Sequence, residues 1–270
     1  MAKKAFVYDG TNWIDIAQST ADLSGYPALA TNQFGFRNKI INGDFRINQR
    51  AYVSAANLAS GSYGFDRWKS NYTNTTLTFT SAPQGQSLTI NSGGGLQQVI
   101  ERANMPAGTY VLSWTGTATG RVYNSGATAP SYAASPVTVT LDGSADVVVE
   151  FTASGGTRTL QNVQLEAGSI ASAFEYRPIG TELASCQRYF WRHAPTGISY
   201  ITHVYAGSQY RLSLPLPVTM RVIPSVTSSG WAGGTTPTLG AANVQSINWY
   251  SLSGAFYIDT GTVVDLSAEL

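Results

Sequence analysis

The sequence holds few residues that could carry out hydrolytic chemistry. Its two histidines, His193 and His203, lie in the C-terminal third, and no Gly-x-Ser-x-Gly nucleophile turn accompanies them. A Ser-His-Asp triad is defined by geometry, so the presence of its residue types alone does not indicate catalysis. Packing at a surface or an interface explains both histidines better. We therefore expect no catalytic residue of the triad type.

Other reactive groups are equally unsupported by their spacing. Glycoside hydrolysis needs two carboxyl groups about 5–10 Å apart. The sequence offers acids without a pattern that selects a pair, namely Glu101, Glu150, Glu166 and Glu175. Cys186 is the only cysteine, which excludes an intramolecular disulfide and a thiolate metal cluster. The glycines at 93–95 are not followed by the Gly-Lys of a phosphate-binding loop. We expect a protein that is not an enzyme and has no cofactor.

Aromatic residues give the stronger signal, because a flat ring can stack on the C–H face of a sugar while polar neighbours bind its hydroxyls. Early in the chain, Trp114 alternates with Leu112 and Trp68 follows an Asp-Arg pair, so both rings are expected in a core. In the C-terminal third, the candidates for glycan contact are Trp231, Tyr205, Tyr210 and Trp249.

Trp231 is the best placed of these candidates. It lies in a segment of serine and glycine, SSGWAGG at 228–234, with Thr235 and Thr236 after it. Glycine lets a backbone approach a ligand closely, and loops often carry binding residues. The alternative is a ring pinned in a core or an interface, whose loss would lower the melting temperature.

The composition limits the class of protein. The 270 residues include 16 Lys and Arg and 15 Asp and Glu, which gives a formal net charge of +1. Charged residues are 11% of the chain, against about 25% in an average soluble domain. The net charge is small and the charged residues are dispersed. This argues against a nucleic-acid partner, because proteins that bind nucleic acid usually carry a stripe of basic residues. Hydrophobic residues make up 43%, enough to form packed cores, so a disordered chain is not expected.

Neither export nor membrane insertion is indicated. The N-terminus lacks the apolar run of a secretory signal peptide. Apolar stretches such as Val147 to Val149 are far shorter than the roughly 20 residues that span a bilayer. We expect a chain made in a cytoplasm without a signal peptide and without membrane insertion.

The first residues predict a β-hairpin followed by a linker. Two short apolar runs at 6–8 and 13–16 flank Asp-Gly-Thr-Asn, in which glycine suits a tight turn. A lone hairpin is marginally stable in water, so this one needs a partner surface. That surface belongs to a sister chain, to a neighbouring protein or to the rest of this chain. Residues 17–33 are small and polar, with Gly25 and Pro27, and are read as an extended linker.

The middle of the chain predicts a β-sandwich. At 109–115 the side chains of Tyr110, Leu112 and Trp114 share one face of a strand. The same alternation recurs in three further stretches, with apolar residues at 137, 139 and 141, at 147, 149 and 151, and at 163 and 165. Turns rich in Gly, Pro and Ser separate these stretches. Short, evenly spaced strands of this kind are typical of a sandwich or jelly roll.

A second, smaller antiparallel β domain is expected after residue 178. Residues 181–186 are read as one helical turn, with Thr181 as N-cap and Glu182 near the positive end of the helix dipole. Beyond it, strands are predicted at 187–191, 199–205, 209–218, 225–228, 244–250, 254–259 and 263–266. Pro215 and Pro217 remove backbone donors from the third of these, which predicts an edge strand.

Several ordered motifs resemble a known family. Residues 38–45 (NKIINGDF) and 65–68 (FDRW) resemble the start of a sandwich domain of bacteriophage tail-fibre and prophage tail proteins. Residues 97–101 (QQVIE) and 107–114 (AGTYVLSW) resemble the central strands of that domain.

The resemblance continues towards the C-terminus. Residues 163–169 (VQLEAGS), 173–178 (AFEYRP) and 186–190 (CQRYF) are similar to the closing strand and exit of the domain. Residues 216–224 (LPVTMRVIP) are similar to a stretch of the domain that follows it in such proteins. The hairpin YDGTNW at 8–13 resembles the segments that attach phage fibres to the virion.

The resemblance implies an all-β, non-enzymatic tail fibre or receptor-binding protein located on the virion. It implies residues 1–37 as attachment hairpin and linker, 38–178 as a jelly roll like a carbohydrate-binding module, and 179–270 as a C-terminal β domain that meets the host glycan. The expected partners are two further copies in a homotrimer, other tail proteins, and host surface polysaccharide or lipopolysaccharide.

The resemblance also implies roles for particular residues. The apolar hairpin residues Phe6, Trp13 and Ile14 are expected to carry particle attachment. Related jelly rolls often hold a structural Ca²⁺ near the first strand, which makes Asp44 the candidate ligand, although Ca²⁺ takes six to eight oxygens. Two alternative functions stay open: a purely structural virion component such as a decoration, spike or adaptor, and a polysaccharide-degrading tail protein.

Overall fold

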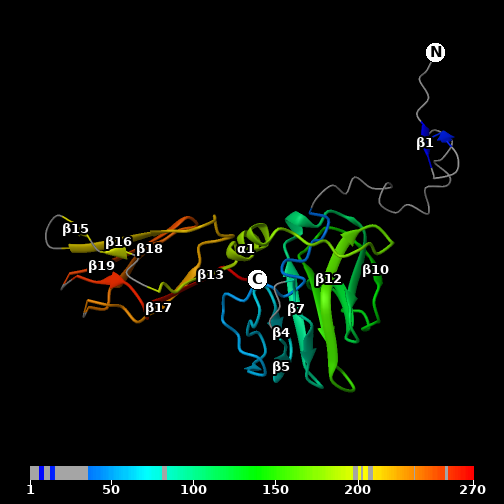
Figure 1. The fold of residues 1–270 in the computed structure, drawn as a ribbon, viewed down its shortest axis with the longest axis horizontal. Helices are drawn as coiled ribbons and strands as arrows, with labels where there is room; N and C mark the ends of the chain where they lie inside the picture. The colour runs from blue at the N-terminus through cyan, green and yellow to red at the C-terminus, as the bar shows by residue number, and fades with distance from the viewer. Residues whose placement is uncertain are drawn as a thin grey trace, which may run out of the picture.

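The computed structural model describes residues 6–8, 13–15, 36–80, 84–196, 200–201, 203–205, 209–233, 235–252 and 255–270. Within these ranges the strands pair antiparallel, with α1 (Ile179–Gln187) as the α-helix and a short 3-10 helix at Arg102–Asn104. The predicted all-β class is confirmed. Figure 1 shows two β lobes, with α1 and the C-terminal residue between them.

The predicted N-terminal hairpin is confirmed for its strands. β1 (Phe6–Tyr8) pairs antiparallel with β2 (Trp13–Asp15), and Val7 lies opposite Ile14. The predicted linker at 17–33 lies outside the described residues.

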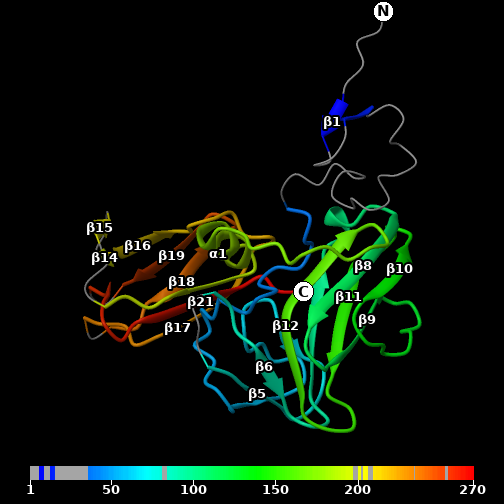
Figure 2. The same ribbon diagram turned by 45° about the vertical axis from the view of Figure 1, so that its right-hand side comes forward.

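Two sheets form the larger lobe, which Figure 2 shows turned. One has the strand order β10-β8-β12-β6-β5-β3 and the other β4-β7-β11-β9. The bounds are β3 Asn57–Leu58, β4 Lys69–Ser70, β5 Thr75–Thr78, β6 Leu88–Ile90, β7 Gly95–Ile100, β8 Gly108–Thr115, β9 Thr119–Asn124, β10 Val137–Leu141, β11 Val147–Thr152 and β12 Arg158–Ala167. The two sheets enclose a common hydrophobic core, as the sandwich prediction requires.

Alternation along the strands explains which residues fill this core. Tyr110, Leu112 and Trp114 of β8 face it, as do alternate residues of β11 and β12. Trp68 and Trp114 are 0% and 7% exposed, so the prediction that both rings are core residues is confirmed. Phe151 joins them, with ring centroids 6.0 Å from Trp68 and 5.0 Å from Trp114.

The helical turn predicted at 181–186 is a longer helix. α1 begins at Ile179, directly after Pro178, which occupies the N-cap position and gives no side-chain hydrogen bond. Thr181 lies inside the first turn, so its predicted role as N-cap is wrong. Glu182 is in the first turn as predicted, near the positive end of the helix dipole. Among the described residues no helix has the length and apolarity to cross a membrane.

Three small sheets form the C-terminal lobe, with strand orders β13-β21-β17, β14-β20 and β15-β16-β19-β18. The bounds are β13 Phe190–His193, β14 Tyr200–Ile201, β15 His203–Tyr205, β16 Gln209–Pro215, β17 Ser225–Ser229, β18 Thr238–Ala242, β19 Ser246–Ser251, β20 Tyr257–Ile258 and β21 Val263–Ser267. A separate hydrophobic cluster, with Leu214, Ile247, Trp249, Phe256 and Leu266, is the core of this lobe. β18 was not predicted, because TLGAA alternates weakly and contains glycine.

The sequence predicts that the proline-containing strand is an edge strand, and this prediction is wrong. β16 pairs with β15 on one side and with β19 on the other. Its pairing with β15 covers only the residues at 209–211, whereas the pairing with β19 reaches Pro215. The prolines thus follow the part that has two neighbours. Here one ladder is unpaired, so a missing N–H donor costs nothing.

A buried ion cluster joins the two lobes. Glu269, just after β21, pairs with Arg67 and with Arg50, whose Nη2 is 3.0 Å from Oε1. The guanidinium carbon of Arg67 lies 3.6 Å from the ring centroid of Tyr189. That of Arg50 lies 3.6 Å from the ring centroid of Phe190. We call Arg50, Arg67 and Glu269 the lobe lock.

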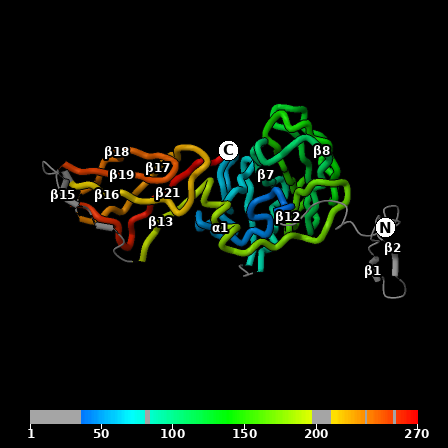
Figure 3. The backbone as a smooth tube through the Cα atoms, turned by 90° about the horizontal axis from the view of Figure 1, so that it is seen from above, coloured from blue at the N-terminus to red at the C-terminus, as the bar shows by residue number. Residues whose placement is uncertain are grey.

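Backbone contacts extend the lobe lock. The carbonyl oxygen of Leu270 accepts hydrogen bonds from Tyr63 Oη at 2.8 Å and Lys69 Nζ at 2.7 Å. Burial, followed by the Glu269 carboxylate, raises the pKa of Tyr63, so its hydroxyl stays protonated as a donor. Figure 3 shows the C-terminal residue at this junction of the lobes. The last residues of the chain thus hold the C-terminal lobe against the sandwich.

Removal of the Glu269 carboxylate is expected to destabilise the junction strongly. Arg67 is 2% exposed, and a buried charge left without its partner costs about 3–5 kcal/mol. We expect Glu269→Ala to lower the free energy of unfolding by about this amount in chemical denaturation, and to let the lobes unfold separately. Ser267→Ala, which removes no charge, is the matched control. A loss below about 1 kcal/mol, the range of an exposed pair, would contradict the lobe lock.

Candidate functional site

Trp231 packs on the core of the C-terminal lobe instead of standing free on a loop. Its ring centroid lies 5.2 Å from Trp249 and 5.5 Å from Phe256, and the ring is partly buried. Its Nε1 donates to Ser228 Oγ at 3.2 Å. The preceding Gly230 has φ +69, and a Cβ there would lie 2.0 Å from the carbonyl oxygen of Gly261. The glycine serves close backbone packing, so its interpretation as a ligand approach is corrected.

The other predicted sugar contacts divide between the core and the undescribed part. Trp249 is 2% exposed and packs in the core of the lobe, and its role as a sugar contact stays a prediction. Tyr210 is partly buried against the same core. Tyr205 lies in β15, where the structure describes the strand but not the side chain.

The residues that alternate with this core line a groove on the opposite face of the sheet. In β16 and β19, Leu212 lies opposite Trp249, whereas Arg211 lies opposite Tyr250 and Ser213 opposite Asn248. A hollow of about 630 Å³ is lined by Arg211, Ser213, Asn248 and Tyr250, by Gly240 and Ala241 of β18, and also by Leu212 and Trp249. We call Arg211, Ser213, Gly240, Ala241, Asn248 and Tyr250 the sheet groove.

β18 shapes one wall of the sheet groove. Its pairing with β19 shifts register between Leu239 and Ala241, which marks a β-bulge at Gly240. A Cβ at Gly240 would lie 3.1 Å from Cδ1 of the Tyr250 ring, so the absence of a side chain leaves that ring accessible from this wall. Bulges commonly redirect side chains next to binding sites.

The sheet groove combines groups suited to hold a hydroxylated ligand. Tyr250 supplies a half-buried ring, and Arg211 and Ser213 are exposed beside it. Asn248 adds an amide that both donates and accepts. Tyr210 and Trp249, the aromatic residues that the sequence predicts as sugar contacts, each lie one position away from a residue of the sheet groove, Arg211 and Tyr250. Leu212 and Leu214 are core residues two positions apart, and so are Ile247 and Trp249. This spacing is the signal that assigns their neighbours at 211, 213, 248 and 250 to the outer face.

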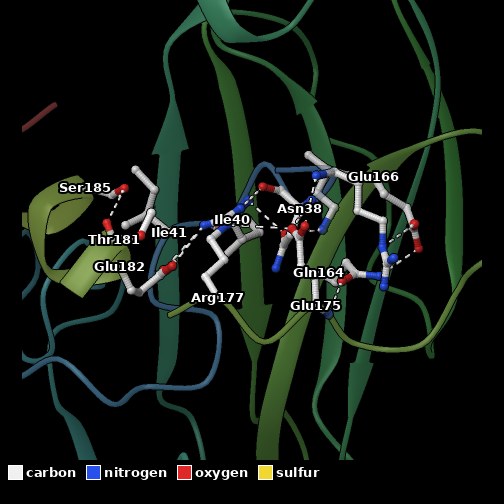
Figure 4. A network of polar contacts seen from close by, with 12 residues as sticks. Asn38, Ile40, Ile41, Gln164, Glu166, Glu175, Arg177, Thr181, Glu182 and Ser185 are labelled. Atoms are coloured by element: carbon white, nitrogen blue, oxygen red, sulfur yellow. Dashed lines mark hydrogen bonds and ion pairs between the residues drawn. The ribbon is translucent and has the colours of Figure 1, made fainter. Parts of the chain in front are cut away.

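The motifs that carry the family resemblance form a buried polar network, shown in Figure 4. Arg177 Nη1 donates to the Ile40 carbonyl oxygen and to Glu182 Oε2, both at 3.1 Å. The Asn38 side chain donates to the Val163 carbonyl oxygen at 3.1 Å and accepts from Ile40 N at 2.9 Å. These groups satisfy one another and the backbone.

The same network extends to the exit of the sandwich. Gln164 Nε2 donates to Glu166 Oε1 at 2.8 Å, and Gln164 Oε1 accepts from Glu175 N at 2.8 Å. We call Asn38, Gln164, Glu166, Glu175, Arg177 and Glu182 the motif latch. It joins the segment around Asn38, at the start of the sandwich, to residues 164–182 at its end, so these motif residues hold the fold together.

The remaining predicted reactive residues are held in ion pairs or packed contacts. The four acids singled out by sequence pair as Glu101–Arg188, Glu150–Arg121, Glu166–Arg37 and Glu175–Arg177. Burial lowers the pKa of His193, whose ring lies 5.4 Å from that of Trp191. The side chain of His203, like those of Phe6, Trp13 and Ile14, lies outside the described part.

Asp44, the candidate calcium ligand, forms an ion pair with Arg46. Burial raises the pKa of Asp44, against the opposing effect of the Arg46 guanidinium. The described ranges contain no cluster of three or more His, Cys, Asp or Glu side chains able to hold a metal ion. The Arg46 guanidinium therefore balances the charge of Asp44, and a calcium ion at this position stays a prediction.

Comparisons with known proteins give only distant likenesses. No family model and no curated protein matches the sequence. The enzymatically active domain of tailspike protein 4 of bacteriophage CBA120 is 14% identical with a TM-score of 0.31, over 49% of this chain and 22% of that one.

A second solved structure is a Paenibacillus cycloisomaltooligosaccharide glucanotransferase complexed with cycloisomaltoheptaose. It is 9% identical with a TM-score of 0.25, over 81% of this chain and 46% of that one. The present chain thus spans about a fifth and about half of the two proteins. TM-scores this low indicate no more than a general likeness of β-structure.

Loss of the Trp231 ring is expected to destabilise the C-terminal lobe. A fully buried aromatic replaced by alanine costs about 3–5 kcal/mol, and a partly buried ring costs less. We expect Trp231→Ala to lower the free energy of unfolding by about 2 kcal/mol in chemical denaturation. Leu252→Ala, at a side chain that is 67% exposed, is the control and should change little. An unchanged unfolding curve for Trp231→Ala would mean that the ring contacts do not stabilise the lobe.

Proposed function

We propose that the protein is a non-enzymatic receptor-binding component of a phage tail, and that its sheet groove binds host surface glycans. The observation that carries the proposal is the outer face of β16, β18 and β19. There the Tyr250 ring, the Arg211 guanidinium and the Asn248 amide line one hollow of about 630 Å³. The motif resemblance to tail-fibre proteins supports the phage assignment.

The chemistry of the sheet groove fits a sugar. The Tyr250 ring gives an apolar face for the C–H groups of a pyranose, and Arg211, Ser213 and Asn248 give donors and acceptors for its hydroxyls. The volume lies within the range of about 300–1,000 Å³ found for small-molecule sites. An aromatic contact contributes on the order of 0.5–1.5 kcal/mol, so a single groove binds weakly and several copies would have to act together.

The lobe lock and the position of the groove suit this role. The sheet that carries the groove belongs to the lobe that does not contain the motif latch. The buried ion cluster would keep that lobe fixed to the sandwich while a glycan pulls on it.

Removal of the Tyr250 ring tests the proposal. We expect Tyr250→Ala to weaken glycan binding and host adsorption about threefold to tenfold, the loss of one aromatic contact, with a nearly unchanged melting temperature. Glycan arrays and adsorption of particles carrying the variant measure these effects. Tyr123→Ala is the matched control, because Tyr123 is also half-buried but lies on β9 of the sandwich.

The outcomes separate the three functions that the sequence left open. Wild-type binding that Tyr250→Ala reduces, without release of reducing ends, supports glycan recognition by the groove. A wild-type protein that binds no glycan would identify a purely structural virion component. Release of reducing ends from host polysaccharide would instead identify a degrading enzyme.

We propose further that the chain forms trimers and attaches to the particle through its N-terminal hairpin. β1 and β2 form a two-stranded sheet of their own, which is marginal in water without a partner surface. Light scattering on the full-length chain is expected to give a trimer, and a monomer at micromolar concentration would contradict this.

Deletion of residues 1–33 tests the attachment role. Both lobes are expected to stay folded, because each has a hydrophobic core built from described residues beyond position 37, whereas incorporation into particles is expected to be lost. Circular dichroism checks the fold, and copurification with virions checks incorporation. Continued copurification of the truncated chain would place attachment elsewhere.

A further inference from the structure

A second cleft lies on the sandwich, far along the chain from the sheet groove. It measures about 280 Å³ and opens between β8, β12 and the segment that leaves β12. Its lining is rich in hydroxyl and amide groups and has no charged side chain: Ser113, Trp114, Thr115, Asn162, Ser172, Ala173 and Phe174. This volume is close to the lower limit of about 300 Å³ for small-molecule sites, so it suits one ring rather than a chain. We call it the bulge cleft.

Asn162 stands in this cleft on a strained backbone. β12 pairs with β8 through Gln161 and again through Gln164, and the register shifts between them. Asn162 lies in this β-bulge with φ +53, in the left-handed region, which asparagine adopts more readily than most residues with a Cβ. Bulges redirect side chains next to binding sites, and retained backbone strain clusters at functional positions. Here the bulge directs an amide to the cleft.

The amide of Asn162 has unused hydrogen-bonding capacity. Its Oδ1 is buried and has no hydrogen-bond partner in the part of the chain that the structure describes. Its Nδ2 donates to Tyr176 Oη at 3.5 Å, a long and weak hydrogen bond. A buried acceptor without a partner is unfavourable. A hydroxyl donated by a ligand would satisfy this acceptor.

An aromatic pair borders the bulge cleft. The rings of Phe174 and Tyr176 meet edge to face, with centroids 4.9 Å apart and an interplanar angle of 80°. Tyr176 is 57% exposed although the Phe174 ring packs against it. A flat apolar ring beside hydroxyls and an amide with an unpaired oxygen suits a neutral sugar. The C–H groups of the sugar would pack on the ring, and its hydroxyls would bind the amide.

We propose that the bulge cleft is a second carbohydrate subsite, which binds a single neutral sugar residue through Asn162 and the Phe174–Tyr176 pair. The uncharged lining selects a neutral ring over a uronic acid or a phosphorylated sugar. The inference shares the ligand class of the proposed function but rests on different residues in the other lobe. The affinity of one such subsite for a monosaccharide is expected to be millimolar.

Asn162→Gly tests this role without threatening the fold. Glycine accepts φ > 0 freely, so the variant keeps the bulge and relieves the strain while it removes the amide. Ala55→Gly is the matched control, because Ala55 has φ +68 and is exposed outside the cleft. Tyr176→Ala removes the exposed ring as a second, independent variant.

The experiment is a titration of the full-length chain with methyl glucoside, methyl galactoside and N-acetylglucosamine, followed by amide chemical shifts in NMR. At least one sugar is expected to shift the amides of Ser113, Asn162 and Phe174. Asn162→Gly and Tyr176→Ala are each expected to weaken that binding about tenfold, as loss of a hydrogen-bonded or stacked contact predicts, with melting temperatures nearly unchanged. Ala55→Gly is expected to bind as the wild type does. Glucuronate and glucose 6-phosphate serve as charged probes and are expected to bind more weakly.

Three results would overturn the inference. They are no cleft amide shifted by any of the neutral sugars, binding that survives both cleft variants, and stronger binding of the charged probes. Tyr250→Ala separates this inference from the proposed function, because it leaves the bulge cleft intact. Shifts confined to the sheet groove and lost in Tyr250→Ala would contradict the second subsite alone, whereas shifts confined to the cleft would contradict the groove.

Discussion

The ion cluster of Glu269 with Arg50 and Arg67 is the interaction on which the arrangement of the two lobes depends. In a chain with few charges, these three are withdrawn from water and stacked against Tyr189 and Phe190. A charge buried in this way is stable only while its partner is present, so the lobes are tied in one relative position.

The motif latch acts within the sandwich as the lobe lock acts between the lobes. Arg177 and Asn38 satisfy carbonyl and carboxylate groups that would otherwise be buried unpaired, and they join segments more than 120 residues apart. The residues that most resemble tail-fibre proteins therefore maintain the scaffold. The groups proposed for binding lie on the outer face of β16, β18 and β19 and in the bulge cleft, where Phe174 and Tyr176 come from the motif at 173–178.

Much of this fold is predictable from the sequence, because alternation reports burial directly. The faces of β8 and β11 and the core position of Trp114 follow from it. The pairing of β1 with β2 follows from the glycine-containing turn between two short apolar runs. The sites are harder to predict. Trp249, a predicted sugar contact, packs in the core with Ile247, whereas Tyr250 is half-buried on the other face of β19, as the alternation along this strand indicates. The pairing of Arg67 with Glu269 joins residues 202 positions apart, which no local pattern encodes.

The central claim is that the sheet groove meets the glycan. Hydrogen–deuterium exchange of the full-length chain, with and without polysaccharide purified from the host surface, tests it directly, because bound sugar slows exchange in the strands that it covers. The account predicts protection in β16, β18 and β19, with β9 and β11 unchanged. Protection confined to β9 and β11, or no protection anywhere at saturating polysaccharide, would contradict it.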